Sequence, residues 1–157
     1  MQFTKNIFKS ILLISILSIG FFSCDEDPVV PNEEELITTV IYTLTPVGVA
    51  GDDVVFSFKD LDGDGGSDPV IVEGVLTAGT TYSGTIQFLN ELETPAEDIT
   101  EEVIEEGEEH QVFYTGTYAA SITVTDEDNS EKPLGIETTW VVGNAGTGTL
   151  TITLRHE

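Results

Sequence analysis

The chain has 157 residues, of which 29 are acidic and five are lysine or arginine, and its formal net charge is −24 at pH 7. All the acidic residues lie after Cys24, where they meet only three basic residues, Lys59, Lys132 and Arg155. Charge-driven binding to DNA, RNA or an anionic lipid surface is therefore excluded, because it needs clustered lysine and arginine. That leaves cations, basic proteins and neutral ligands as partners, or a charge that serves solubility alone.

Residues 1–23 have the pattern of a secretory signal peptide. Two lysines form a short basic start, and the apolar run that follows is shorter than the about 20 residues that span a bilayer. Cys24, the only cysteine, ends the segment Phe-Phe-Ser-Cys, which resembles a bacterial lipobox. We therefore expect acylation at Cys24 and attachment to a membrane through the lipid. The alternative is an ordinary signal peptide cut nearby, which would leave a free thiol.

Residues 24–35 predict a disordered tether behind the lipidated cysteine. The segment holds six acidic residues and two prolines but no lysine, a composition that repels itself and stays extended. Acidic residues directly after the cysteine resemble the surface-export signal of Bacteroidetes lipoproteins. In enterobacteria an aspartate at this place indicates retention at the inner membrane instead. We expect an outer-membrane protein that faces the cell surface.

Residues 36–157 predict one all-β domain. Apolar and small polar residues alternate with a period of two in short runs bounded by glycine, aspartate, asparagine and proline. The runs cover residues 36–45, 54–58, 70–76, 82–88, 112–115, 120–124, 136–142 and 150–154. About eight short strands are typical of an antiparallel β-sandwich of the immunoglobulin-like kind. We expect Trp140 in its core and a hairpin loop at residues 143–146.

One segment interrupts the strand pattern. Thr94 and Glu97 have the spacing of a capping box, and Pro95 would occupy the first helical position. Ile99 and Val103 follow at helical spacing, so the sequence predicts a short helix over residues 95–106.

This helix would carry a strongly acidic face. Asp98, Glu102, Glu105 and Glu109 follow one another at spacings of four, three and four, and each like-charge pair costs a few tenths of a kcal/mol. A bound cation or a basic partner would relieve the repulsion, so the four residues are a candidate partner-binding surface. The alternative is a solvated face whose opposite side packs on the sandwich.

The loop after the second strand resembles a calcium site. Asp60, Asp62, Asp64, Gly66 and Asp68 occupy positions at which an EF-hand-type loop supplies oxygen ligands. The twelfth position is an isoleucine where such loops have a bidentate glutamate, and strands rather than helices flank the segment. Asp-Gly pairs also form plain turns, so the sequence predicts either a Ca²⁺ site or a turn without metal.

Two further groups of residues carry side chains that can bind metal ions. The acidic residues 126–131 lie between strands and fit either a cation site or a polar turn. His110 and His156 are the only histidines, and two histidines can bind zinc or haem. Glu106 stands four residues before His110, but Gly107 interrupts the helix that this spacing needs. His156 also stands next to the C-terminus, so the sequence argues against both histidines binding one metal ion or haem.

No motif of an enzyme is present in the sequence. It has no nucleophile elbow and no phosphate-binding glycine loop, and acylation would remove its single thiol. Its abundant carboxylates lack the apolar pocket that would separate the pKa values of a glycosidase pair. We therefore expect a protein that is not an enzyme, with no catalytic residues.

Four stretches resemble a family of small flavobacterial lipoproteins, often labelled type 1 periplasmic binding fold superfamily proteins. They are EEELITTVIYTLTP, FKDLDGDGGSDPV, TPAEDITEEVIEEGEEHQVFY and the final LTITLRHE. The resemblance covers nearly the whole mature chain and implies a Bacteroidetes cell-envelope setting, without catalytic or binding residues. The fold in that label is a two-lobed α/β structure, whereas this chain has no alternation of strands and helices.

The leading functional hypothesis is a surface-exposed lipoprotein whose β-sandwich is a non-catalytic binding or interaction module for a protein or glycan. In this hypothesis Ca²⁺ stabilises the loop of residues 60–68. The alternative is an accessory subunit of an outer-membrane uptake or envelope complex, which docks a basic partner through its acidic face.

Overall fold

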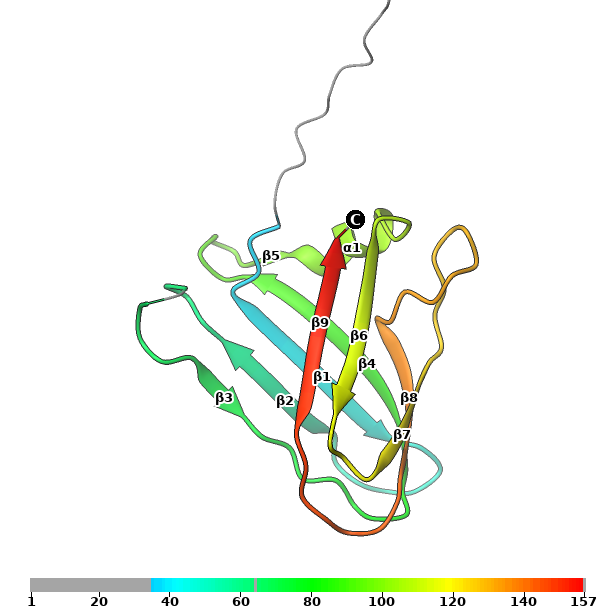
Figure 1. Ribbon diagram of the computed structural model, residues 1–157. Coiled ribbons are helices and arrows are strands. Elements are labelled where there is room, and N and C mark those ends of the chain that lie inside the picture. Colours follow the sequence, from blue (N-terminus) through cyan, green and yellow to red (C-terminus); the bar gives the residue numbers. More distant parts are fainter. Residues whose placement is uncertain (1–34, 64, 157) are drawn as a thin grey trace, which may run out of the picture. The chain divides into compact units, whose positions relative to one another are not determined.

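The computed structural model describes residues 35–63 and 65–156. The predicted signal peptide, Cys24 and all of the tether except Glu35 lie outside these residues. The described chain is built of strands, with the short helix α1, Ile99–Glu105, between two of them (Figure 1). The predicted all-β antiparallel sandwich is confirmed.

The strands form two sheets of unequal size. The larger sheet has the strand order β3-β2-β1-β4-β8-β7, with β5 added to β4, and the smaller sheet pairs β6 with β9. All pairs are antiparallel. The bounds are β1 Thr39–Pro46, β2 Val54–Lys59, β3 Val70–Val72, β4 Thr81–Asn90, β5 Glu97–Asp98, β6 His110–Gly116, β7 Ala120–Val124, β8 Glu137–Val142 and β9 Leu150–His156.

Alternation along the strands builds one apolar face on the larger sheet. Side chains on a strand point to opposite faces in turn, so Val40, Tyr42 and Leu44 of β1 share a face. Their register partners continue the same face across the sheet. These partners are Phe58, Phe56 and Val54 on β2, and Phe88, Ile86 and Gly84 on β4.

The core lies between this face and the smaller sheet. Trp140 is buried as predicted, and its indole N–H donates a hydrogen bond of 2.5 Å to the hydroxyl of Tyr42. That hydroxyl also hydrogen-bonds to the buried Thr138, again at 2.5 Å. From the smaller sheet, Val112 is buried, and Tyr114 packs with its ring centroid 5.3 Å from that of Tyr42. The polar atoms of the buried aromatic residues are thus partnered, as a water-excluding core requires.

Helix α1 begins later than the sequence predicts. Glu97 and Asp98 pair with β4 as strand β5, so the chain remains extended up to Asp98. The Asp98 side chain then caps the helix by accepting a hydrogen bond of 3.1 Å from the N–H of Thr100. Thr100 fastens the first turn to the larger sheet, because its hydroxyl accepts a hydrogen bond of 2.8 Å from the N–H of Phe88.

The predicted hairpin at residues 143–146 is wrong. Strand β8 already has β4 on one side and β7 on the other, so both of its edges are occupied. The next strand, β9, pairs instead with β6 in the other sheet. The segment between β8 and β9 therefore crosses from one sheet to the other.

The buried hydroxyl pair generates the first prediction, at Gly84. A Cβ at Gly84 would lie 2.4 Å from Oγ1 of Thr138 and 2.7 Å from the hydroxyl of Tyr42. We expect Gly84→Ala to lower the free energy of unfolding by about 1–3 kcal/mol, because the overpacked core has to shift. Urea unfolding followed by tryptophan fluorescence measures this change.

Gly146→Ala is the matched control, since nothing lies within 4 Å of the Cβ that it would add. We expect it to change the free energy of unfolding by no more than about 0.5 kcal/mol. Equal effects of the two substitutions would contradict the packing described here.

Candidate functional site

The aspartates at the start of the candidate calcium loop are hydrogen-bonded to its backbone. One carboxylate oxygen of Asp60 accepts hydrogen bonds from the N–H groups of Gly63, at 2.9 Å, and Asp62, at 3.3 Å. Asp62 accepts one from the N–H of Ser67 at 3.0 Å, and this bond is the main cause of the lowered pKa of the Asp62 carboxyl. Both side chains therefore order a turn, as short acidic residues commonly do.

The remaining residues of the calcium prediction are placed in part. Asp64 lies outside the described residues, and Asp68 is exposed. Gly66 packs so closely that a Cβ there would lie 2.3 Å from the carboxylate carbon of Asp62. A side chain there would displace the exposed Asp62 carboxylate, and calcium binding stays a prediction.

The four acidic residues predicted to share a helix face are spread over three kinds of structure. Glu102 and Glu105 lie in α1, Asp98 is its N-cap, and Glu109 lies in the turn before β6. The prediction of one acidic helix face is therefore wrong, because α1 has only seven residues and does not include all four positions. Desolvation and nearby carboxylates, first among them that of Glu106, raise the pKa of Glu102. The acidic residues do crowd together here, and their binding of a partner stays a prediction.

The acidic residues 126–131 form a turn. The two carboxylate oxygens of Asp126 accept hydrogen bonds from the N–H groups of Gly135, at 3.0 Å, and Ile136, at 2.8 Å. Asp128 accepts one from Ser130 and one from Lys132, each at 2.8 Å. Backbone donors therefore account for these carboxylates without a cation.

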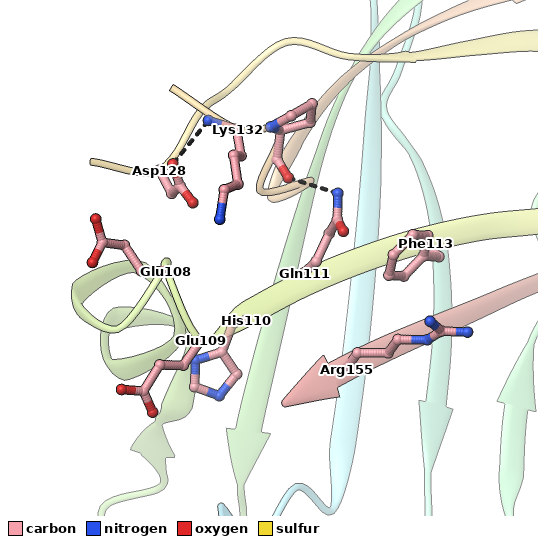
Figure 2. Close-up of a pocket in the computed structure, with 9 residues that line it drawn as sticks. Glu108, Glu109, His110, Gln111, Phe113, Asp128, Lys132 and Arg155 are labelled. Carbon is pink, nitrogen blue, oxygen red and sulfur yellow. Dashed lines mark hydrogen bonds between the residues drawn. The ribbon is translucent and has the colours of Figure 1, made fainter. Parts of the chain in front are cut away.

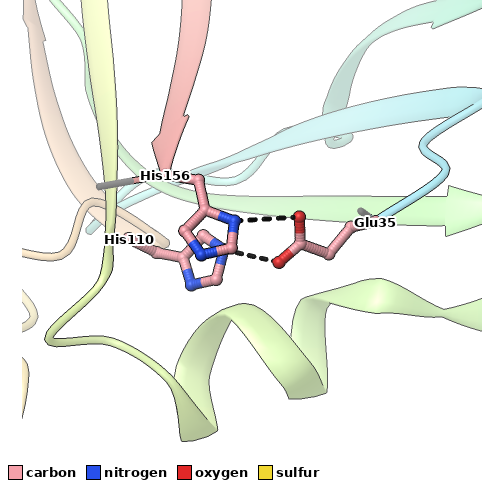
Figure 3. Close-up of side chains that lie close together, drawn as sticks. All are labelled: Glu35, His110 and His156. Carbon is pink, nitrogen blue, oxygen red and sulfur yellow. Dashed lines mark hydrogen bonds and ion pairs between the residues drawn. The ribbon is translucent and has the colours of Figure 1, made fainter. Parts of the chain in front are cut away.

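A cluster that the sequence analysis did not predict joins Glu35, His110 and His156 (Figure 3). Strands β6 and β9 are paired so that His110 faces His156, and the ring centroids lie 4.4 Å apart. Glu35, just before β1, points its carboxylate at both rings. One oxygen lies 2.8 Å from Nε2 of His110 and the other 3.3 Å from Nδ1 of His156.

The cluster is mostly shielded from water. The side chain of His110 is 0% exposed, that of Glu35 is 9% exposed and that of His156 is 21% exposed. Nδ1 of His110 lies 3.1 Å from the backbone carbonyl of Glu106. On the open side, Nε2 of His156 lies 3.5 Å from the more exposed carboxylate of Glu109. Each histidine therefore has one nitrogen toward Glu35 and the other toward a second oxygen.

The charges in the cluster shift two pKa values in opposite directions. Desolvation disfavours the charged form of Glu35, but a backbone hydrogen bond and the two histidines outweigh it and lower the pKa of the carboxyl. Desolvation likewise disfavours charged His156, but Glu35 and Glu109 outweigh it and raise the pKa of the imidazole. The cluster thus favours a positive charge beside ionised Glu35.

The alternation of inward and outward side chains along the strands indicates part of this cluster. His110 lies two residues before the buried Val112, and His156 lies two residues after Leu154. Both histidines therefore continue the inner rows of their strands. Periodicity does not say which strands pair, however, and without the pairing of β6 with β9 the two positions are unrelated.

A small polar hollow lies beside the cluster on the same end of β6 (Figure 2). Its volume is about 60 Å³, enough for a few water molecules. Lys132 and Arg155 line it together with acidic residues, and the Arg155 guanidinium carbon lies 4.9 Å from the centre of the Phe113 ring. Two of the few basic residues therefore lie among acidic residues here and do not form a basic patch.

Apolar side chains stay exposed where the smaller sheet does not cover the larger one. In Figure 1, β2 and β3 lie to one side of β6 and β9. Phe58 on β2 belongs to the inner face but is 42% exposed, and its partner Ile71 on β3 is 62% exposed. A trough of about 340 Å³ adjoins Phe58. We call these two residues, with the trough residues Leu36, Leu61 and Leu92, the open shelf.

Comparison of the chain with protein-family models, with curated proteins and with solved structures found no match. Among residues 35–63 and 65–156, no helix is long and apolar enough to cross a membrane.

If the loop binds calcium, millimolar Ca²⁺ should raise the melting temperature of the full chain in detergent and release heat on titration, since binding stabilises the folded state. We expect Asp62→Asn to reduce both effects, whereas Asp53→Asn, which changes an exposed acid outside the loop, should leave them intact. If millimolar Ca²⁺ produced no heat on titration and no rise in melting temperature, the calcium site would be ruled out.

The shifted pKa values predict how pH changes the contribution of the cluster in metal-free protein. Because the pKa of His156 is raised, its contribution to the free energy of unfolding is fully present below pH 6.5, the ordinary pKa of histidine. This contribution is lost as pH rises through the raised pKa. The lowered pKa of Glu35 makes its contribution complete above 4.5, and that contribution is lost as pH falls through the lowered value. The cluster should therefore stabilise the fold most between these two values.

Melting temperatures of the wild type and His156→Gln in EDTA measure this dependence. The advantage of the wild type should be largest near pH 5.5 and should shrink toward pH 9. Arg155→Gln is the control, because the guanidinium stays charged across this range. An advantage over His156→Gln that grows with pH would contradict the electrostatic account.

Proposed function

We propose that this chain is a lipoprotein anchored through Cys24 in the outer membrane of a bacterial cell, and that its β-sandwich is a non-catalytic, outward-facing binding module for a partner protein. The order of the chain supports this proposal: an apolar leader, a single cysteine, an acidic tether and then one all-β domain. A lipid anchor with a long tether displays a domain to partners without inserting it into the bilayer.

The open shelf is the observation that carries the proposed binding. Its residues are large and apolar, and they lie together on the inner face and end of β2. Elsewhere on this face, residues such as Tyr42 and Phe88 are almost fully buried. Water against such a surface is unfavourable, and contiguous exposed apolar side chains commonly mark a binding surface.

The surroundings of the shelf favour a basic partner. Asp60 and Asp62 line the trough beside Phe58. Lys59, the one basic residue of β2, forms an ion pair with Glu91. A partner with lysine or arginine near its apolar residues therefore complements this surface. A second copy of the chain is disfavoured, because it would bring the same negative charge.

The sheet edge favours an extended partner segment. Strand β3 ends the strand order of the larger sheet, and within the described residues its outer edge is unpaired. An extended peptide that pairs with such an edge sends alternate side chains to opposite faces. Every second side chain would then point to the same face of the sheet as Ile71 and Phe58. We therefore propose a segment in which apolar and basic residues alternate, as in a basic subunit of an envelope complex.

Synthetic ten-residue peptides test the proposed partner against the full chain in detergent. We expect a peptide of alternating lysine and valine to bind, and a peptide of alternating glutamate and valine not to bind. Phe58→Ser should weaken binding about fivefold or more, since covering half a phenylalanine side chain contributes about 1 kcal/mol. Fluorescence anisotropy of a labelled peptide measures these affinities.

Val55→Ser is the matched control for Phe58→Ser. Val55 lies on the same strand, is 41% exposed and points to the other face of the sheet. We expect its substitution to leave peptide binding unchanged. Equal weakening by both substitutions, or none by either, would contradict docking on the shelf. A neutral oligosaccharide that binds in place of the basic peptide would replace the proposed partner with a glycan.

A further inference from the structure

The donor atoms of Glu35, His110 and His156 have the spacing of a metal coordination sphere. One ligand atom from each residue lies within 4.8 Å of the other two. The shortest nitrogen–oxygen distances are 2.8 Å and 3.3 Å, each to a different carboxylate oxygen of Glu35. Ligands of a tetrahedral zinc ion, each about 2.0–2.1 Å from the metal, lie about 3.3 Å from one another. The three side chains would need only small shifts to enclose such an ion.

The orientation of His110 favours a proton or a metal ion between its ring and Glu35. A backbone carbonyl can only accept a hydrogen bond, so Nδ1 of His110 donates to Glu106. In a neutral ring this leaves an unprotonated Nε2, whose lone pair faces a carboxylate oxygen of Glu35 at 2.8 Å. Two acceptors at this distance repel each other unless a proton or a metal ion lies between them. The side chain of His110 is fully buried, so water does not screen the repulsion.

The outer contacts of the cluster match those of metal-bound histidines. A histidine ligand usually donates its second N–H to a backbone carbonyl or a carboxylate, which fixes the orientation of the ring. His110 has the carbonyl of Glu106 in this place. His156 has the carboxylate of Glu109, 3.5 Å from Nε2, which leaves Nδ1 toward Glu35. In both rings, therefore, one nitrogen points toward Glu35 and the other faces an oxygen outside the three residues.

We propose that Glu35, His110 and His156 bind a divalent transition-metal ion, with zinc the best match to two imidazoles and one carboxylate. Nitrogen ligands favour zinc and its first-row neighbours over calcium and magnesium, which prefer oxygen. In this proposal water supplies the fourth ligand from the partly exposed side of His156. This site is independent of the open shelf, and it fixes residue 35, where the predicted tether ends, to the ends of β6 and β9.

Isothermal titration of the full chain in detergent with ZnCl₂ tests the site. We expect one tightly bound Zn²⁺ per chain, and loss of this binding in His156→Gln. Glu109→Gln removes only an outer contact and should weaken zinc binding about tenfold to hundredfold. Glu101→Gln is the control, because it removes an exposed acidic residue from α1 and should leave the affinity unchanged.

Co²⁺ gives a second readout that does not depend on stability. When bound to the wild type, Co²⁺ should show the intense visible bands of a four-coordinate ion, and His156→Gln should lose them while circular dichroism shows it folded. The absence of both zinc binding and these bands would overturn the proposal and leave a protonated ion pair at the cluster. Zinc binding of equal strength in His156→Gln would also overturn it, since surface carboxylates would then be the ligands.

Discussion

The pairing of β6 with β9 is the interaction on which the rest of this structure depends. The two strands are the whole of the smaller sheet in the described chain, and they close the core over the larger one together with Ile99 and Val103 of α1 and the segment that holds Leu134 and Ile136. Their register sets His110 opposite His156 at one end. Because two strands cannot cover a sheet of this width, the inner face over β2 and β3 stays open. The histidine cluster and the open shelf are therefore two consequences of one pairing.

Several of the many acidic residues specify local structure through hydrogen bonds, in addition to giving the domain its negative charge. Asp98 caps a helix, while Asp60, Asp62, Asp126 and Asp128 accept hydrogen bonds from backbone N–H groups in turns. Such bonds specify where the chain turns. Other acidic residues still crowd around α1 and the loop after β2. The negative field of the domain then attracts cations and repels anions at whichever of its surfaces they approach.

Local patterns in the sequence predicted the faces of the strands but not their partners. Alternation placed Tyr42, Trp140 and their neighbours in the core, because side-chain direction is a property of each strand alone. The helix start was missed because Glu97 and Asp98 pair with β4, and this tertiary pairing outweighed the capping pattern at Thr94. The hairpin after β8 failed for the same reason. The histidine cluster needed a contact between residues 110 and 156, on strands far apart in the sequence, which no local pattern encodes.

The most direct test of this account is a nuclear Overhauser measurement between the rings of His110 and His156. The chain has two histidines, so their imidazole signals can be assigned by substituting one of them. We predict a cross-peak between the two rings, whose centroids lie 4.4 Å apart, in metal-free protein. It should be accompanied by cross-strand peaks between Val112 and Leu154. Absence of both sets of peaks in folded protein would contradict the register of β6 and β9, and with it the proposed metal site.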